Sequence, residues 1–108
     1  MKASTPVADA TQKSWFVYLI ECTDGSIYTG ITIDVASRYT AHLDGKGARY
    51  TRSHRPLRLL ATEIHPDRSA ASKAEYRIKQ LSVAGKWAYV ELLRRQNIMP
   101  PAPGSEPA

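Results

Sequence analysis

Residues 15–20 read Trp-Phe-Val-Tyr-Leu-Ile and residues 26–31 read Ser-Ile-Tyr-Thr-Gly-Ile, with Thr23-Asp24-Gly25 between them. The first run, continued to Cys22, is apolar on both alternating faces, as in a central strand that is covered on both sides. The second run predicts a shorter strand that ends at Thr32. Aspartate followed by glycine between two such runs is typical of a β-hairpin. The fold is therefore expected to begin with an antiparallel pair of strands.

The length of the hairpin loop decides where two tyrosines point. A two-residue loop would place Tyr18 and Tyr28 on opposite faces of the sheet. A three-residue loop with Gly25 at positive φ pairs Cys22 with Ser26 and places both tyrosines on one face. We expect the three-residue loop, because the two phenols can then share one site.

The rest of the chain predicts one further strand and three helices. Asp34 is a good N-cap for a helix that Gly45 closes, and its apolar positions are Val35, Ala36, Tyr39 and Leu43. The other expected elements are a strand over 57–65, a helix from Ser69 to Gly85 and a helix over 86–95. The order ββαβαα predicts an α+β fold, a small three-stranded and mainly antiparallel sheet flanked by helices.

Length and composition indicate one small domain. The chain has 108 residues, enough for a single core. We expect the domain to span residues 14–97, with disordered tails at 1–13 and 98–108, the second rich in proline. The single cysteine, Cys22, cannot form an internal disulfide and is interpreted as a small buried group. No run is long enough to cross a bilayer, and the N-terminus lacks the apolar core of a secretory signal. We expect a cytoplasmic protein that does not contact membranes.

The charge is concentrated in one segment. The chain carries 15 basic and 10 acidic residues, a formal charge of +5. From Gly45 to Arg58 the sequence contains no carboxylate. Such a segment indicates a phosphate-facing surface, with an ordinary solvated loop as the alternative. The expected nucleic-acid contacts are Lys46, Arg49, Tyr50, Arg52, His54 and Arg55.

Four side chains near the hairpin suit phosphate chemistry. Arg38 and His42 lie at i and i+4 of the first expected helix, so they share one face. Arginine can bind a phosphate through two hydrogen bonds, and histidine can move a proton near neutral pH. The alternative is an ordinary exposed helix face. Tyr18 and Tyr28 can be core aromatics or can orient a water, and Gly30 leaves backbone room beside them for a ligand.

Glu75 has three interpretations. It can pair with Lys79 at i+4, or close a capping box with Ser72 as its N3 residue. If the helix begins at Ser69, Glu75 lies well inside it and can face a cleft, and this start is favoured. A single carboxylate can hold Mg²⁺ when waters and a substrate phosphate fill the other positions.

Together these residues resemble the GIY-YIG endonuclease family, and in particular its small stand-alone bacterial members. Val17-Tyr18-Leu19 and Tyr28-Thr29-Gly30 stand where the two name-giving tripeptides would be, and the segments 47–52 and 54–56 are also similar. The resemblance covers about residues 15–93. Val17, Leu19 and Thr29 differ from the family pattern, whereas both tyrosines and Gly30 are kept. No counterpart of the family's late asparagine is found, since Asn97 lies too far along.

The resemblance implies a nuclease with one divalent cation, Mg²⁺ or Mn²⁺. Glu75 would hold the cation, Tyr28 would position the attacking water, and Arg38 would neutralise the scissile phosphate. Tyr18 and His42 would assist Tyr28. The expected catalytic residues are Tyr18, Tyr28, Arg38, His42 and Glu75.

Two other functions remain open at this point. The chain can be a nucleic-acid-binding module with little cleavage that acts with a partner protein, or a small domain for protein contacts. The intact catalytic set favours the nuclease, with DNA favoured over RNA and a protein partner available for targeting.

Overall fold

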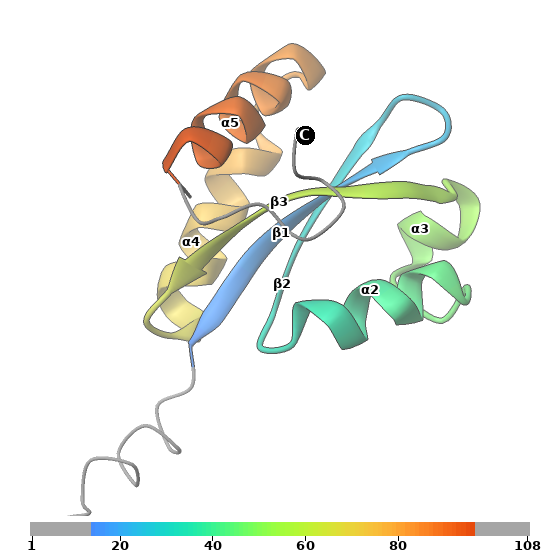
Figure 1. The fold of residues 1–108 in the computed structure, drawn as a ribbon, viewed down its shortest axis with the longest axis horizontal. Helices are drawn as coiled ribbons and strands as arrows, with labels where there is room; N and C mark the ends of the chain where they lie inside the picture. The colour runs from blue at the N-terminus through green and yellow to red at the C-terminus, as the bar shows by residue number, and fades with distance from the viewer. Residues whose placement is uncertain (1–13, 97–108) are drawn as a thin grey trace, which may run out of the picture.

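A computed structural model describes residues 14–96, and the expected tails at 1–13 and 98–108 lie outside the described residues. Three antiparallel strands form one sheet in the order β2-β1-β3. Helices α2 and α3 lie on one side of this sheet, and α4 and α5 on the other (Figure 1). The bounds are β1 Trp15–Cys22, β2 Ile27–Thr32, α2 Val35–Leu43, α3 Arg49–Ser53, β3 Pro56–His65, α4 Arg68–Lys79 and α5 Val83–Gln96. The predicted α+β class with its three-stranded antiparallel sheet is confirmed.

The central strand β1 is buried on both faces, as its sequence predicts. Val17 and Leu19 pack into a cluster with residues of α4 and α5. Tyr18, Ile20 and Cys22 face the other way and pack with partly buried residues of β2, α2 and β3. The interpretation of Cys22 as a small buried group is confirmed, and burial raises the pKa of its thiol.

The hairpin has the expected three-residue loop. Gly25 adopts φ of 90°, and its N–H donates to the carbonyl of Cys22 at 2.9 Å. The N–H of Cys22 donates to Ser26 O at 2.8 Å, which closes the pair that the sequence predicts. Tyr28 pairs with Ile20 and therefore shares a face with Tyr18, with the two ring centroids 6.1 Å apart.

Helix α2 begins and ends as expected but presents a different face. The Asp34 carboxylate accepts from Ser37 N at 3.1 Å, and Gly45 at φ of 76° follows the helix end. Leu43, expected in the core, is 49% exposed, whereas His42 is 1% exposed. The side of α2 that faces the sheet carries Val35, Tyr39 and His42, at positions i, i+4 and i+7. Leu43 follows His42 and points away from that side. The expected core position was therefore wrong by one residue.

Helix α3 lies in the segment expected to be a loop. Its N-cap, Ala48, makes no side-chain cap bond. The helix is anchored instead by Thr51, which is buried and donates from its hydroxyl to Ala48 O at 3.0 Å. A five-residue helix without apolar periodicity leaves no pattern in the sequence, which is why the predicted order lacked it.

Two boundaries of the later helices differ from expectation. Helix α4 is capped by Asp67, whose carboxylate accepts from Ala70 N at 2.8 Å, rather than by Ser69. The same start excludes the capping box at Ser72, and Glu75 lies inside the helix as predicted. Helix α4 ends at Lys79 instead of continuing to 85, because the Ser82 hydroxyl accepts from Gly85 N at 3.0 Å and caps α5.

The cap assignment gives a stability test. Asp67→Ala is expected to lower the free energy of unfolding by about 1 kcal/mol, because it leaves a backbone N–H at the helix start without its acceptor. Ser69→Ala and Ser72→Ala should each stay within about 0.5 kcal/mol of wild type in urea denaturation. A larger loss for either serine variant than for Asp67→Ala would contradict the assignment.

Candidate functional site

A chain of hydrogen bonds runs under α2 from the sheet to α3. Tyr18 Oη lies 2.9 Å from His42 Nε2, and His42 Nδ1 lies 2.6 Å from Thr51 Oγ1. The Thr51 hydroxyl donates to Ala48 O, so its oxygen is free to accept from Nδ1–H. Nδ1 therefore carries the proton, and Nε2 accepts from the Tyr18 hydroxyl.

We call this hydrogen-bonded chain of Tyr18, His42 and Thr51 the relay. Burial keeps the relay uncharged at neutral pH. Burial and the neighbouring Tyr28 raise the pKa of Tyr18 to about 12, which the Arg38 guanidinium opposes. Burial lowers the pKa of His42 below its usual range, and the nearby Arg38 adds to that effect. A neutral phenol donating to a neutral imidazole agrees with the tautomer that the hydrogen bonds require.

Four predicted residues meet in one place, which we call the Tyr–His cluster: Tyr18, Tyr28, Arg38 and His42. The Tyr28 ring lies 5.2 Å from the His42 ring between centroids. Tyr18 and His42 are buried, whereas Tyr28 and Arg38 are partly exposed. Within residues 14–96, no carboxylate lies within ion-pair distance of Arg38. The cluster thus exposes one phenol and one guanidinium without a carboxylate partner.

Two glycines leave the space that the buried rings of Tyr18 and His42 fill. A Cβ at Gly30 would lie 2.6 Å from Tyr18 Oη, and a Cβ at Gly47 would collide with the His42 imidazole. The room beside Gly30, which the sequence suggested for a ligand, is therefore filled by the Tyr18 ring.

The aromatic contacts continue from the cluster onto α3. Tyr28 stacks with Tyr50 at 5.8 Å, and Tyr50 stacks with His54 at 3.9 Å between centroids. His54 Nδ1 donates to Tyr50 O at 3.0 Å, and its Nε2 lies 3.6 Å from an Asp24 carboxylate oxygen. His54 is thus held by the hairpin loop and α3, and Tyr50 lies between the rings of Tyr28 and His54 with 37% of the residue exposed.

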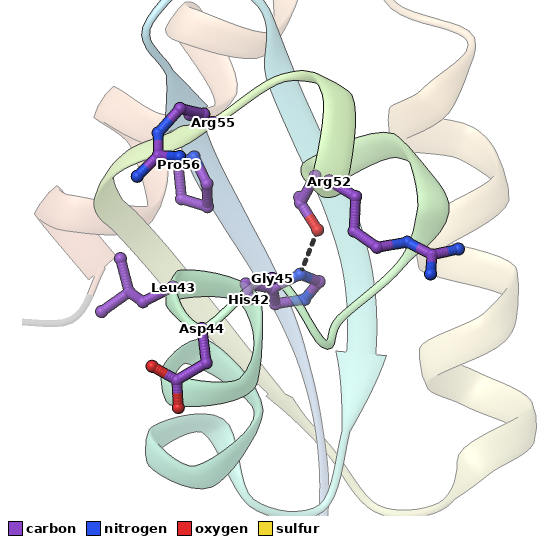
Figure 2. A pocket seen from close by; sticks show the side chains of 8 residues that line it. His42, Leu43, Asp44, Gly45, Arg52, Arg55 and Pro56 are labelled. Carbon is purple, nitrogen blue, oxygen red and sulfur yellow. Dashed lines mark hydrogen bonds between the residues drawn. The ribbon is translucent and has the colours of Figure 1, made fainter.

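The basic segment presents its charges outward. Four of its expected contact residues are exposed, and within the described part of the chain they form no ion pair with a carboxylate: Lys46, Arg49, Arg52 and Arg55. Arg58, in contrast, pairs with Glu21 at 2.6 Å. Arg52 and Arg55 border a cavity of about 290 Å³ over His42, in which Arg52 extends away from the imidazole (Figure 2).

Glu75 comes from the other side of the sheet than α2 and α3. It is on α4, which covers the opposite face of the sheet, and its carboxylate pairs with Lys79 Nζ at 3.1 Å. The side chain is 22% exposed. Among residues 14–96, no three His, Cys, Asp or Glu side chains are grouped to hold a metal ion. Glu75 therefore offers a single carboxylate, which suits a cation whose other positions are filled by water and phosphate.

The structure adds polar residues that sequence reasoning missed. Thr51 fixes the His42 tautomer, and its only sequence signal was its place in the segment 47–52. Thr29 and Lys86 line a cavity with Tyr28, Tyr50 and Lys79. No local pattern indicated Thr29 or Lys86, because β2 and the start of α5 are brought together only by the fold.

The family comparison matches most of the chain. The model of the GIY-YIG catalytic domain matches residues 14–89. A UPF0213 protein of Cupriavidus pinatubonensis is 50% identical over 86 residues, which cover 80% of this chain and 96% of that protein. A UPF0213 protein of Desulfotalea psychrophila is 51% identical over 84 residues, covering 77% of this chain and 76% of that protein.

One solved structure is similar. The solution NMR structure of a UPF0213 protein from Bacillus halodurans is 47% identical, covers 73% of this chain and 84% of that chain, and gives a TM-score of 0.48. The name UPF0213 states no activity.

In the described part of this chain, no helix has the length and apolar character needed to cross a membrane.

The relay predicts a measurable tautomer. At neutral pH, ¹⁵N NMR of the imidazole should show His42 protonated on Nδ1 alone, with titration below the usual range for histidine. Thr51→Val keeps the shape of the side chain but removes the acceptor, so the Nε2-protonated tautomer should appear beside it. Thr40→Val, on the exposed side of α2, is the control and should leave the spectrum unchanged. A wild-type His42 protonated on Nε2 would contradict the relay.

Proposed function

Because this chain belongs to the GIY-YIG catalytic domain family, we propose that it is an endonuclease that hydrolyses phosphodiester bonds of nucleic acid with one divalent cation. Family membership supports a nuclease-type function. The observation that carries the proposal is the Tyr–His cluster, in which the Arg38 guanidinium and the Tyr28 phenol both lie next to the buried pair of Tyr18 and His42. DNA as the favoured substrate, a partner protein for targeting and a cytoplasmic location belong to the same proposal.

Arg38 binds the scissile phosphate. Its guanidinium has no carboxylate partner among the described residues, so a phosphate does not have to displace one. Two parallel N–H donors match two phosphate oxygens, and they stabilise the negative charge that develops there. This charge stabilisation is the largest contribution that we assign to a side chain of the cluster.

Tyr28 orients the attacking water. It is the accessible phenol of the cluster, whereas Tyr18 and His42 are each 1% exposed and act as positioning residues for Tyr28. The water oxygen forms the new bond to phosphorus, the ester oxygen leaves, and solvent takes and supplies the protons. The neutral relay keeps the Tyr28 ring against His42 without adding a charge that would compete with Arg38 for the phosphate.

Glu75 would hold the cation. A hard divalent cation prefers carboxylate oxygen and keeps several waters, so one carboxylate is enough when the substrate supplies phosphate oxygens. When bound, such a cation stabilises charge on the phosphate and on the leaving oxygen. The exposed basic residues on and beside α3, Lys46, Arg49, Arg52 and Arg55, bind the strand on either side of the reacting bond.

A binding module without efficient cleavage is the second candidate. The ion pair between Glu75 and Lys79 favours it, since a carboxylate that is already paired can be purely structural. The two candidates differ in what they require of the Glu75 charge.

Glu75→Gln separates the two candidates. The variant keeps shape and helix propensity but removes the charge that a hard cation needs. We expect binding of a labelled oligonucleotide in EDTA that is no weaker than that of wild type, because Lys79 loses its carboxylate partner. Cleavage in Mg²⁺ or Mn²⁺ should be lower by at least about a hundredfold, because charge stabilisation by the cation is worth several kcal/mol. Glu91→Gln, an exposed carboxylate on α5, is the matched control. Cleavage by Glu75→Gln within a few-fold of wild type would favour the binding module.

The exposed arginines of the basic segment predict the salt dependence of binding. If Arg49 and Arg52 contact phosphates, each alanine substitution should reduce the slope of log K against log salt by about 0.7–0.9. Arg77→Ala on α4 removes the same charge from an exposed site outside the loop and should leave the slope unchanged. Fluorescence anisotropy measures the slopes. Equal slopes for wild type and a variant with both Arg49→Ala and Arg52→Ala would reject the basic segment as the strand-binding surface.

A further inference from the structure

A second cavity of about 370 Å³, which we call the edge cavity, lies at the outer edge of β2. Its lining residues come from four elements and are Ile27, Tyr28, Thr29, Tyr50, Lys79 and Lys86. Among residues 14–96, strand β2 pairs with β1 alone, so its other edge leaves backbone groups open. Tyr28 points to the Tyr–His cluster, and Thr29, one residue on, points to the opposite face. The edge cavity therefore adjoins the proposed reaction centre.

Two ammonium groups converge on the edge cavity. Lys86 Nζ donates to the open carbonyl of Ile27 at 3.3 Å. Burial and the neighbouring positive charge of Lys79 both lower the pKa of Lys86. Lys79 is also paired with Glu75 at 3.1 Å, which leaves one positive charge in excess among the three residues. Two like charges held this close are stabilised by an anion between them.

A buried hydroxyl in the same lining has no partner. Thr29 is 2% exposed, and within residues 14–96 its Oγ1 lacks a hydrogen-bond partner. Buried hydroxyl groups in folded proteins are nearly always satisfied, so an orphan one beside a cavity points to a ligand atom that completes it. A phosphate or sugar oxygen is suited to this position, because it accepts from both a hydroxyl and an ammonium group.

The remaining wall is aromatic. Tyr28 and Tyr50 stack at 5.8 Å with an angle of 29° between their planes, and Tyr50 is 37% exposed. His54 stacks on Tyr50 as well, so the ring offers its edge rather than a free face. An aromatic edge beside two cations suits a nucleotide, with the base against that edge and the phosphate on the ammonium groups. A simple anion would need only the lysines.

We propose that the edge cavity binds a nucleotide of the substrate strand next to the cleaved bond, with its phosphate on Lys79 and Lys86, its sugar–phosphate oxygen on Thr29 and its base against the exposed edge of the Tyr50 ring. This proposal rests on the proposed function, because it assigns a neighbouring nucleotide of that substrate.

Thymidine 3′,5′-bisphosphate tests the edge cavity without cleavage. Titrated into the ¹⁵N-labelled protein in EDTA, it should shift the amide signals of Thr29, Tyr50 and Lys86. Lys86→Met keeps the apolar stem but removes the charge, and should weaken binding about tenfold, as expected for one hydrogen bond to a charged group. Lys73→Met, an exposed lysine on α4 outside the cavity lining, is the matched control and should bind as wild type.

Thr29→Val adds a signature that a purely structural role would not give. The variant should bind the bisphosphate a few-fold more weakly, yet melt at a higher temperature than wild type, because it removes a buried hydroxyl without a partner. A lower melting temperature would mean that the hydroxyl is satisfied within the protein and would overturn its assignment to a ligand.

The outcomes separate this proposal from the proposed function. If the protein cleaves nucleic acid but Lys86→Met and Lys73→Met bind the bisphosphate equally, the edge-cavity proposal fails alone. If the bisphosphate binds in the edge cavity but no nucleic acid is cleaved, the proposed function fails and the binding site stands. Absence of bisphosphate binding to wild type, or binding no tighter than that of inorganic phosphate, would overturn the nucleotide assignment.

Discussion

Burying a phenol and an imidazole beneath a helix destabilises a fold unless the hydroxyl and both ring nitrogens have hydrogen-bond partners. The chain from Tyr18 through His42 to Thr51 meets this requirement with residues of β1, α2 and α3. Each residue satisfies the next, so α3 is fixed relative to the sheet by the same bonds that fix the site. The placement of Tyr50 and of the basic residues on and beside α3 follows from that anchor.

The same relay decides the electrostatics of the proposed reaction centre. With His42 neutral, Arg38 carries the one permanent charge of the Tyr–His cluster. A protonated His42 would add a second positive charge that could not move toward the phosphate, because both ring nitrogens are already bonded. A mobile proton is thus less suited to His42 than the task of holding Tyr18 and Tyr28 in place.

Local patterns predicted those parts of the fold that local interactions determine. The doubly apolar run of β1, the Gly25 turn and the Asp34 cap each depend on residues close in sequence, and each is confirmed. Helix α3 and the buried position of His42 depend on a bond between α2 and α3, which no periodicity reveals. In the site, four residues could be named from spacing and resemblance, whereas Lys86 contacts Ile27 across 59 positions of sequence and could not.

Lys79 contacts both the proposed cation ligand and the proposed nucleotide site, because it pairs with Glu75 and also lines the edge cavity. An i,i+4 ion pair on a helix surface is worth only about 0.3–0.5 kcal/mol, so Lys79 holds the Glu75 carboxylate weakly. When that carboxylate takes a stronger partner, the Lys79 ammonium is released beside the edge cavity, where it can bind a phosphate instead. Under the two proposals, occupation of Glu75 and binding of the neighbouring nucleotide therefore favour each other. The ion pair seen here is then the resting arrangement of a site whose charges are redistributed when substrate binds.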